Sequence, residues 1–318
     1  MTSASSTPGK TSTLRIGTRG SPLALAQAHE TRQRLMEAHD LAPEMFEIVV
    51  IRTTGDRVID RPLKEIGGKG LFTREIEEAM LTGRIDIAVH SMKDMPVLQP
   101  EGLVIDCLLP REDERDAFVS DSVAGIDALA SGQVVGTSSL RRRAQLLWRR
   151  PDLKVVEFRG NVQTRLRKLA EGVADCTFLA TAGLNRLGMA DIARGPIAPE
   201  AMLPAVGQGC IGIERRADDE TVAALLAPIH DQDTAIRLAA ERAYLARLDG
   251  SCETPIAGLA LIEGGEIWLR GEILRPDGSD CLADEGRAPL ADAALLGREI
   301  AERLLARAPA DFFDWRMG

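Results

Sequence analysis

The chain has 318 residues, of which 45% are hydrophobic, and this length allows two or three domains with cores of their own. Its formal net charge of −9 disfavours binding to nucleic acid or to an anionic membrane, and an aromatic content of 3% disfavours a platform for stacked bases. No apolar run approaches the about 20 residues that a membrane-spanning helix needs.

The first residues are polar and rich in Ser and Thr, without the apolar core of a signal peptide. We therefore expect residues 1–13 to form a disordered tail. The five cysteines include no CxxC pair, and a chain of this size needs no disulfide staples. This pattern indicates free thiols and a cytoplasmic protein.

The first predicted element is a strand at residues 14–16. It runs into a turn containing Ser21 and Pro22, the residue types that favour the N-cap and the first position of a helix. A strand at 46–51, a helix carrying Ile76 and Met80, and a strand at 85–89 follow. This alternation predicts parallel strands joined by right-handed crossovers.

The sequence Gly-Gly-Lys-Gly at residues 67–70 resembles a phosphate-binding loop. That pattern requires Gly at position 63 and Ser or Thr at position 70, where the chain has Leu63 and Gly70. We therefore expect a mobile lid instead, with Lys69 available to an anion.

Two segments predict crossings between α/β units. Residues 110–115 are highly charged, and strands at 118–119, 134–135, 155–158 and 177–180 follow them. Residues 203–209 are rich in Gly and Pro, and the next strand, 210–213, would return to the first sheet. The predicted fold is thus α/β, with two lobes like those of periplasmic binding proteins and a site in the cleft. We assign residues 14–110 and 210–230 to the first lobe and 111–209 to the second.

The last part of the chain predicts a small α+β domain at residues 231–318. It begins with a helix at about 234–248, continues with a hairpin of strands 256–262 and 266–274, and ends with a helix at 290–305. Gly264 and Gly265 supply the turn of the hairpin. A domain of this size is within the normal range.

Residues 136–168 contain ten basic residues against two acidic ones. Such a run is usually a solvated helix face. Here, however, two groups lie at predicted helix N-termini, where backbone N–H groups also attract anions: Arg141 with Arg142, and Arg159 with Arg165. Arginine also suits bidentate binding of carboxylates, so we predict an anion site.

Five of the remaining six basic residues of this run are assigned to the surface: Arg143, Arg149, Arg150, Arg167 and Lys168. For the helix that begins after residue 139, the predicted core face consists of Leu140, Ala144, Leu147 and Trp148.

Asp94 follows the strand 85–89, at the carboxyl edge of the sheet where sites are built. Lys93 should help to keep it ionised, and a fixed carboxylate there could accept N–H bonds from a heterocycle and stabilise a cation. The alternative is an Asp that only caps a turn. His90 is interpreted as structural, because four widely spaced histidines form no metal-ligand pattern.

Cys252 differs from the other cysteines because it lies in a polar turn, 249–255, directly after a helix. It can therefore be accessible to reagents. No His close in sequence could serve as its base, which disfavours a thiol protease. The other four are interpreted as structural and buried: Cys107, Cys176, Cys210 and Cys281.

Together these motifs resemble the porphobilinogen deaminase (hydroxymethylbilane synthase) family over about residues 14–307. The matching segments are residues 15–25, 67–72, 86–96, 115–120, 135–142, 159–166, 182–188 and 203–209. The resemblance implies a monomer and a dipyrromethane cofactor attached to Cys252 through a thioether. It also implies that four porphobilinogens are added in turn, each losing ammonia, before hydrolysis releases the linear tetrapyrrole hydroxymethylbilane.

The resemblance further implies roles for individual residues. Asp94 would be catalytic, with its carboxylate binding pyrrole N–H groups and stabilising a methylenepyrrolenine cation. The implied cofactor contacts are Lys93, Ser139, Arg141, Arg142, Arg159, Arg165 and Arg186. The implied substrate contacts are Arg19, Ser21, Lys69, Phe72, Arg159, Arg165 and Arg186. Since each pyrrole carries two carboxylates, a chain of six rings would carry about twelve negative charges, which the dense arginines would balance.

The chain departs from the family pattern at two places. Ser251 stands where many relatives have a second Gly before the cysteine, which leaves the thiol in place. Glu65 stands where many bacterial relatives have a loop lysine, and Lys64 is its neighbour.

Two other classes of protein remain as alternatives. A solute-binding clamshell that only captures anions would need an export signal and gives no role to Cys252 and Asp94. A nucleic-acid binder that uses the arginine run is disfavoured by the overall charge and the scarce aromatic residues.

Overall fold

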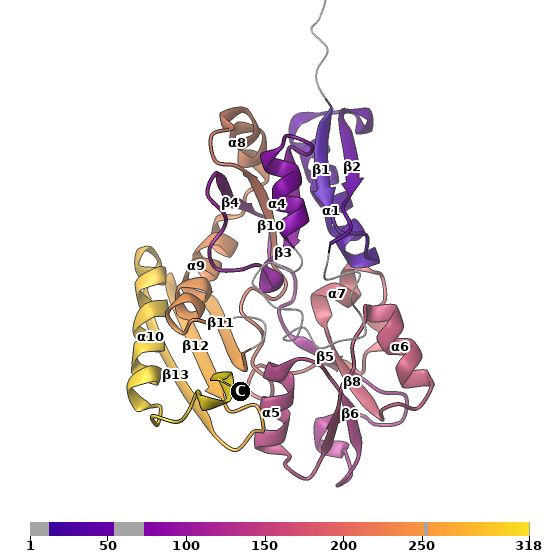
Figure 1. Cartoon of the computed structure of the whole chain (residues 1–318), viewed down its shortest axis with the longest axis vertical. Coiled ribbons are helices and arrows are strands. Elements are labelled where there is room, and N and C mark those ends of the chain that lie inside the picture. The colour runs from indigo at the N-terminus through magenta and orange to yellow at the C-terminus, as the bar shows by residue number, and fades with distance from the viewer. Residues whose placement is uncertain (1–12, 54–72, 251–253, 318) are drawn as a thin grey trace, which may run out of the picture.

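The computed structural model describes residues 13–53, 73–250 and 254–317, which fold around three sheets (Figure 1). The first lobe is built on the sheet β2-β1-β3-β10-β4, and the second on β7-β6-β8-β5-β9. The C-terminal domain contains the sheet β11-β12-β13.

In the first lobe, β1 (Leu14–Thr18) pairs in parallel with β2 (Phe46–Val50) and β3 (Ile87–Ser91). The predicted parallel crossovers are confirmed. β10 (Ile211–Arg216) lies antiparallel between β3 and β4 (Leu103–Leu108), so the predicted return of the chain to the first sheet is also confirmed. The strand β4 was not predicted. Among the described residues of this lobe, the helices are α1 (Pro22–His39), α4 (Arg74–Leu81) and α8 (Glu220–Leu226).

In the second lobe, β6 (Val134–Gly136) pairs in parallel with β7 (Lys154–Val156) and β8 (Cys176–Ala180). β5 (Asp116–Val119) runs antiparallel to β8 and also pairs with the short β9 (Gly195–Pro196). The helices are α5 (Leu140–Arg149), α6 (Val162–Ala170) and α7 (Thr181–Arg186).

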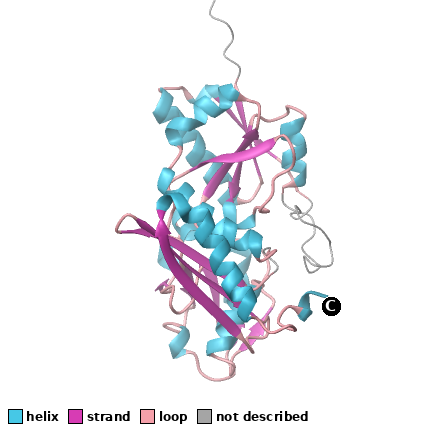
Figure 2. Ribbon diagram, turned by 90° about the vertical axis from the view of Figure 1, so that its left-hand side faces the viewer, coloured by secondary structure: helices cyan, strands magenta, loops and turns pink. Residues whose placement is uncertain are grey.

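The C-terminal domain is an antiparallel meander of β11 (Ile256–Glu263), β12 (Glu266–Leu274) and β13 (Cys281–Pro289). It is covered by α9 (Gln232–Arg247) and α10 (Ala293–Arg307), as Figure 2 shows. The predicted hairpin is confirmed, whereas its third strand was not predicted. Gly297 allows the close approach of the two helices, because a Cβ there would lie 2.1 Å from the carbonyl oxygen of Ala240.

Short 3-10 turns complete the described chain. They are η1 (Pro43–Met45), η2 (Met92–Asp94), η3 (Ile126–Ala128), η4 (Ala190–Ile192), η5 (Ala227–Ile229), η6 (Leu290–Asp292) and η7 (Asp314–Met317). Among the described residues, no helix combines the length and the apolar character that crossing a membrane requires.

The two lobes are joined by two crossings that lie side by side. Glu112 N donates to Gly209 O at 3.3 Å, and Arg111 Nε donates to Gln208 O at 2.9 Å. The predicted double crossing is therefore confirmed. The residue limits that we assigned to the domains stay a prediction.

The predicted core face of α5 is wrong in part. Trp148 is 46% exposed, and Leu140 and Leu147 are only half-buried. The buried residues are instead Arg141, Arg142, Ala144, Gln145 and Leu146. The physical reason is that a buried carboxylate and backbone carbonyls of the second lobe receive the two guanidinium groups, so these polar side chains replace apolar ones against the sheet.

Candidate active site

Asp94 lies on the turn η2 that directly follows β3, the central parallel strand of the first sheet. The turn is anchored by Met92, which is 3% exposed and whose N–H donates to Cys210 O at 3.0 Å. Gly212 leaves space for this anchor, because a Cβ there would lie 2.1 Å from Met92 Sδ. Asp94 itself is exposed. The fold thus presents this carboxylate at the carboxyl end of a buried strand, as the sequence predicts.

A small cavity adjoins Asp94 and brings two predicted substrate residues, Arg19 and Ser21, to the same place. Ser21 has a second role that the sequence predicts, because its Oγ accepts the N–H of Ala24 and caps α1. The other lining residues were not assigned to the site: Leu23, Ala24, Gln27, Thr73, Val89, His90, Ser91 and Met95.

Three of the lining residues, Gln27, His90 and Ser91, belong to two polar pairs. Gln27 Nε2 donates to Ser91 Oγ at 2.8 Å. His90 Nε2 lies 3.0 Å from Glu214 Oε2, with side-chain exposures of 5% and 0%. The structural interpretation of His90 is confirmed. Neither Gln27 nor Ser91 was assigned to the site from the sequence, and the packing of α1 against β3 brings them together here.

Across from Asp94, Arg141 and Arg142 share the buried carboxylate of Asp116. Asp116 Oδ2 lies 2.7 Å from Arg141 Nη2, and Asp116 Oδ1 lies 2.7 Å from Arg142 Nη2. Burial alone would raise the pKa of Asp116, but the two guanidinium groups outweigh it and hold that pKa well below its ordinary value. Both arginines are 4% exposed. Their role toward the cofactor stays a prediction, and Asp116 is a site neighbour that the sequence did not reveal.

Lys93 lies between Asp94 and the cluster of Asp116, Arg141 and Arg142. Its Nζ donates to Gln208 Oε1 at 3.4 Å. Burial lowers the pKa of Lys93 to about 8, with Arg142 and Arg141 adding to the decrease and Asp94 and Asp116 opposing it. Because charges from both lobes act on this one ammonium group, the two lobes face each other at this point.

Arg165 of the second lobe is likewise influenced by Asp94 of the first lobe. Burial lowers the pKa of Arg165 to about 10, Arg142 and Arg159 lower it further, and Asp94 raises it. Arg165 Nε donates to Gly160 O at 2.9 Å, and Asn161 caps the helix that carries it, as predicted. Arg165 and Arg159 are half-buried.

Two other predicted residues of the second lobe have structural partners. Arg186 Nε lies 3.1 Å from Glu30 Oε2 of α1, and its Nη2 donates to Gly209 O at 3.1 Å. Its side chain is 8% exposed, so it bridges the lobes next to the second crossing. Ser139 caps α5, because its Oγ accepts the N–H of Arg142 at 3.4 Å.

Cys252, Lys69 and Phe72 lie outside the described residues, as do Lys64 and Glu65. What flanks Cys252 is described. Asp249 has a positive φ of 48°, and Gly250 N donates to Leu245 O at 3.0 Å, which ends α9. Thr254 and Pro255 lead into β11, so Cys252 lies between the end of a helix and the start of a strand.

The four other cysteines are buried or half-buried in the described structure. Cys107, Cys176 and Cys210 are buried, and burial raises their pKa values to about 12, 12 and 11. Cys281 is half-buried rather than buried as predicted, and its partial burial raises its pKa to about 12. Within residues 13–53, 73–250 and 254–317, no group of three or more His, Cys, Asp or Glu could hold a metal ion.

The fold and the site define a two-lobed α/β protein in which buried and half-buried cations of one lobe lie near an exposed carboxylate of the other. The chain belongs to the porphobilinogen deaminase family. The family model "Porphobilinogen deaminase, dipyromethane cofactor binding domain" matches residues 14–224, and "Porphobilinogen deaminase, C-terminal domain" matches residues 235–306. The resemblance seen in the sequence is thereby confirmed.

Curated relatives support the same assignment over nearly the whole chain. The porphobilinogen deaminase of Paracoccus denitrificans is 70% identical over 308 residues, covering 97% of this chain and 98% of the relative. That of Nitrobacter hamburgensis is 54% identical over 298 residues, covering 94% of each. Among solved structures, the methionine-binding protein MetQ covers 70% of this chain and 91% of its own, with a TM-score of 0.43 and 15% identity.

Proposed function

We propose that this chain condenses four porphobilinogen molecules, with loss of ammonia, onto a dipyrromethane primer bound to Cys252, and releases hydroxymethylbilane by hydrolysis. The observation that carries the proposal is the position of Asp94. Its exposed carboxylate shares a cavity with Arg19 and Ser21 and acts electrostatically on Lys93 and Arg165. A carboxylate surrounded by cations suits a substrate with its own carboxylates and a reacting centre that becomes positive.

The residues present fit a dipyrromethane with its carboxylate side chains. Three buried or half-buried cations, Lys93, Arg141 and Arg142, lie around the buried carboxylate of Asp116 and outnumber it, while Asp94 acts on Lys93 and Glu272 on Arg141. Arg141 Nε is buried without a hydrogen-bond partner among the described residues. Such an excess is costly unless an anion balances it. When bound, the dipyrromethane supplies the free pyrrole carbon that is extended.

The chain's own groups then have distinct tasks. Asp94 accepts pyrrole N–H bonds and stabilises positive charge next to it. Arg19 and Ser21 orient the carboxylates of the incoming porphobilinogen at the cavity. Lys93, Ser139 and the arginines of the second lobe hold the carboxylates of the primer and of the growing chain: Arg141, Arg142, Arg159, Arg165 and Arg186. Lys69 and Phe72 contribute further substrate contacts.

The test is to incubate the purified protein with porphobilinogen and to measure ammonia and the linear tetrapyrrole by mass spectrometry. We expect four molecules of ammonia for each tetrapyrrole released. A protein that binds porphobilinogen and releases no ammonia would be a solute binder, and the proposal would then be wrong.

We further propose that the protein is a cytoplasmic monomer with no nucleic-acid partner. The net charge of −9 supports the last point. Light scattering on the eluted peak of a sizing column gives the mass in solution, and a mass near twice the chain's 34.4 kDa would overturn the monomer.

A further inference from the structure

Gln208 lies in the second crossing, where the backbone of this segment packs against the turn that carries Asp94. Its neighbours Gly207 and Gly209 have positive φ values of 70° and 86°. A Cβ on Gly207 would lie 3.2 Å from Lys93 N, so the crossing and the catalytic turn are in direct contact. Gln208 is 1% exposed.

The orientation of the Gln208 amide is fixed by its partners. Its Nε2 donates to Glu114 O at 2.8 Å and to Asp116 Oδ1 at 2.9 Å. Both partners only accept hydrogen bonds, so the nitrogen must face them. The oxygen Oε1 is therefore left to face Lys93 Nζ, at 3.4 Å.

Lys93 combines a hydrogen bond to this oxygen with the electrostatic effect of nearby carboxylates, of which Asp94 acts most strongly. Within the part of the chain that the structure describes, Gln208 is its hydrogen-bond partner, and no carboxylate forms an ion pair with it. The charged groups that face it are Asp94 from η2, Asp116 from β5, and Arg141 and Arg142 from α5. A neutral acceptor orients the ammonium without neutralising it, which leaves its charge available to a bound anion.

We infer that Gln208 is a positioning residue for the reaction: its amide holds the Lys93 ammonium beside Asp94 and ties it to the Asp116–Arg141–Arg142 cluster across the two lobes. The inference rests on the proposed function in one respect, namely that Lys93 receives carboxylates of the pyrrole chain. Nothing in the motifs of the sequence indicates the link, because Lys93 and Gln208 are 115 positions apart.

The test is the titration of Lys93 in Gln208→Met and Gln208→Glu. Met removes the oxygen that accepts the Lys93 hydrogen bond and so disfavours the charged amine. The pH midpoint of the Lys93 titration should therefore fall from about 8. Glu loses the hydrogen bonds that the amide donates to Glu114 O and Asp116 Oδ1, but its negative charge lies among Lys93, Arg141 and Arg142, so the midpoint of Lys93 rises. We expect shifts of opposite sign, each about half a pH unit or more. The readout is the pH dependence of labelling by an amine reagent, resolved at Lys93 by peptide mass spectrometry.

These labelling experiments use the full-length chain with Cys252→Ser, which has no thiol at that position to attach the cofactor. The matched control is Gln145→Met. Gln145 is 0% exposed, and its amide pairs with Leu203 O at 2.9 Å and Leu203 N at 2.7 Å rather than with Lys93. We expect Gln145→Met to lower the free energy of unfolding and to leave the titration midpoint of Lys93 unchanged.

Activity of the cofactor-bearing variants supplies the second readout. The pH at which kcat declines on the alkaline side should be lower in Gln208→Met and higher in Gln208→Glu, in parallel with the midpoint of Lys93. Midpoints that match the wild type, or that shift in the same direction in both variants, would overturn the inference, as would alkaline limbs that do not move. If the midpoints move in opposite directions and no variant or wild type condenses porphobilinogen, the proposed function fails instead.

Discussion

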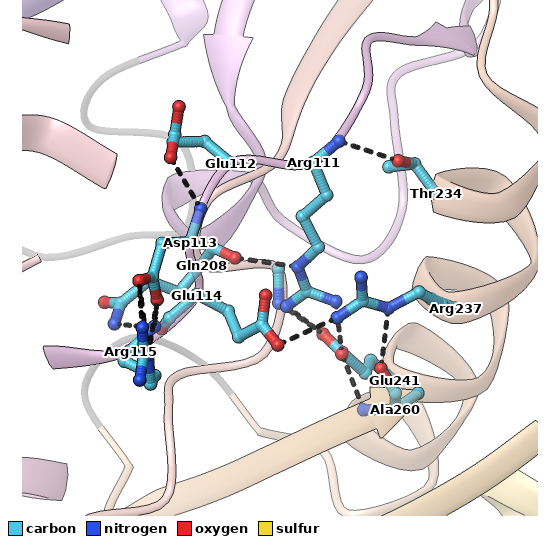
Figure 3. A network of polar contacts seen from close by, with 11 residues as sticks. Arg111, Glu112, Asp113, Glu114, Arg115, Gln208, Thr234, Arg237, Glu241 and Ala260 are labelled. Carbon is cyan, nitrogen blue, oxygen red and sulfur yellow. Dashed lines mark hydrogen bonds and ion pairs between the residues drawn. The ribbon is translucent and has the colours of Figure 1, made fainter. Parts of the chain in front are cut away.

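The guanidinium of Arg111 and the carboxylate of Glu241 form a two-pronged ion pair, at 2.6 and 3.1 Å, with side-chain exposures of 1% and 0% (Figure 3). Glu241 also accepts the N–H groups of Gly207 at 2.7 Å and Ala260 at 2.8 Å. Burial alone would lower the pKa of Arg111, but Glu241 outweighs it and raises that pKa. One carboxylate of α9 therefore joins both crossings to the C-terminal domain that carries Cys252.

Glu241→Gln should lower the free energy of unfolding by about 3–5 kcal/mol, because it leaves the buried Arg111 without its counter-ion. Urea denaturation measures the loss. Glu302→Gln is the control, since its pair with Arg247 at 3.1 Å has side chains 57% and 47% exposed and should contribute less than about 1 kcal/mol. Equal losses in the two variants would contradict the role of Glu241 as the junction of the domains.

Asp116→Asn should cost about 3–5 kcal/mol of stability at pH 7, because Arg141 and Arg142 lose their shared charge. The folded-state pKa of Asp116 is depressed, so its contribution is fully present above the ordinary value of about 3.9 and is lost as the pH falls toward the folded-state pKa. The difference in unfolding free energy between wild type and variant should thus be constant above about pH 5 and narrow below about pH 4. A difference that widens in acid would show that Asp116 is not held ionised.

Gly209→Ala, in the second crossing, should lower the free energy of unfolding by more than the cost of placing Ala at a positive φ. Its φ is 86°, and a Cβ would lie 2.3 Å from Glu112 O of the first crossing. Gly132→Ala is matched in φ, at 80°, but has nothing within 4 Å of its Cβ. We expect about 1–2 kcal/mol for Gly132→Ala and about 1–3 kcal/mol more for Gly209→Ala, by thermal or urea unfolding. Equal costs would mean that the crossings are not in close contact.

Asp94→Asn should retain the covalent cofactor and lower kcat for tetrapyrrole formation by about 10²- to 10³-fold, because an amide cannot stabilise the developing positive charge. Asp191→Asn, on an exposed 3-10 turn of the second lobe, serves as the control and should behave like the wild type. Tetrapyrrole formed per unit time gives the rates. Normal turnover in Asp94→Asn would remove this residue from the mechanism.

Much of the architecture follows from local signals. Ser21, Ser139 and Asn161 each occupy the N-cap of a helix, the position that their residue types favour. Gly264 and Gly265 form the turn of the predicted hairpin. The strand after the second crossing returns to the first sheet, as its apolar pattern and the preceding Gly and Pro residues predict. These features depend on a few neighbouring residues, and periodicity reveals them.

The features that the sequence did not reveal depend on distant partners. The strand β13 carries Asp284, Glu285 and Arg287 and is half-exposed along its length, so it lacks the apolar alternation of a strand and is fixed by its pairing with β12. Arg141 and Arg142 are buried because Asp116, 25 positions before Arg141, lies under them on β5. Cation-rich segments predict an anion site, but only the fold shows that an internal carboxylate already occupies part of it.

The central claim is that Cys252 carries a pyrrole primer that is extended at its far end. Intact mass spectrometry of the protein after incubation with porphobilinogen, followed by removal of free substrate, tests it most directly. We expect the chain mass plus two linked pyrroles, further increments of one pyrrole each when excess substrate is present, and the bare chain mass for Cys252→Ser. A wild-type protein that keeps its bare chain mass under the same treatment would contradict the account.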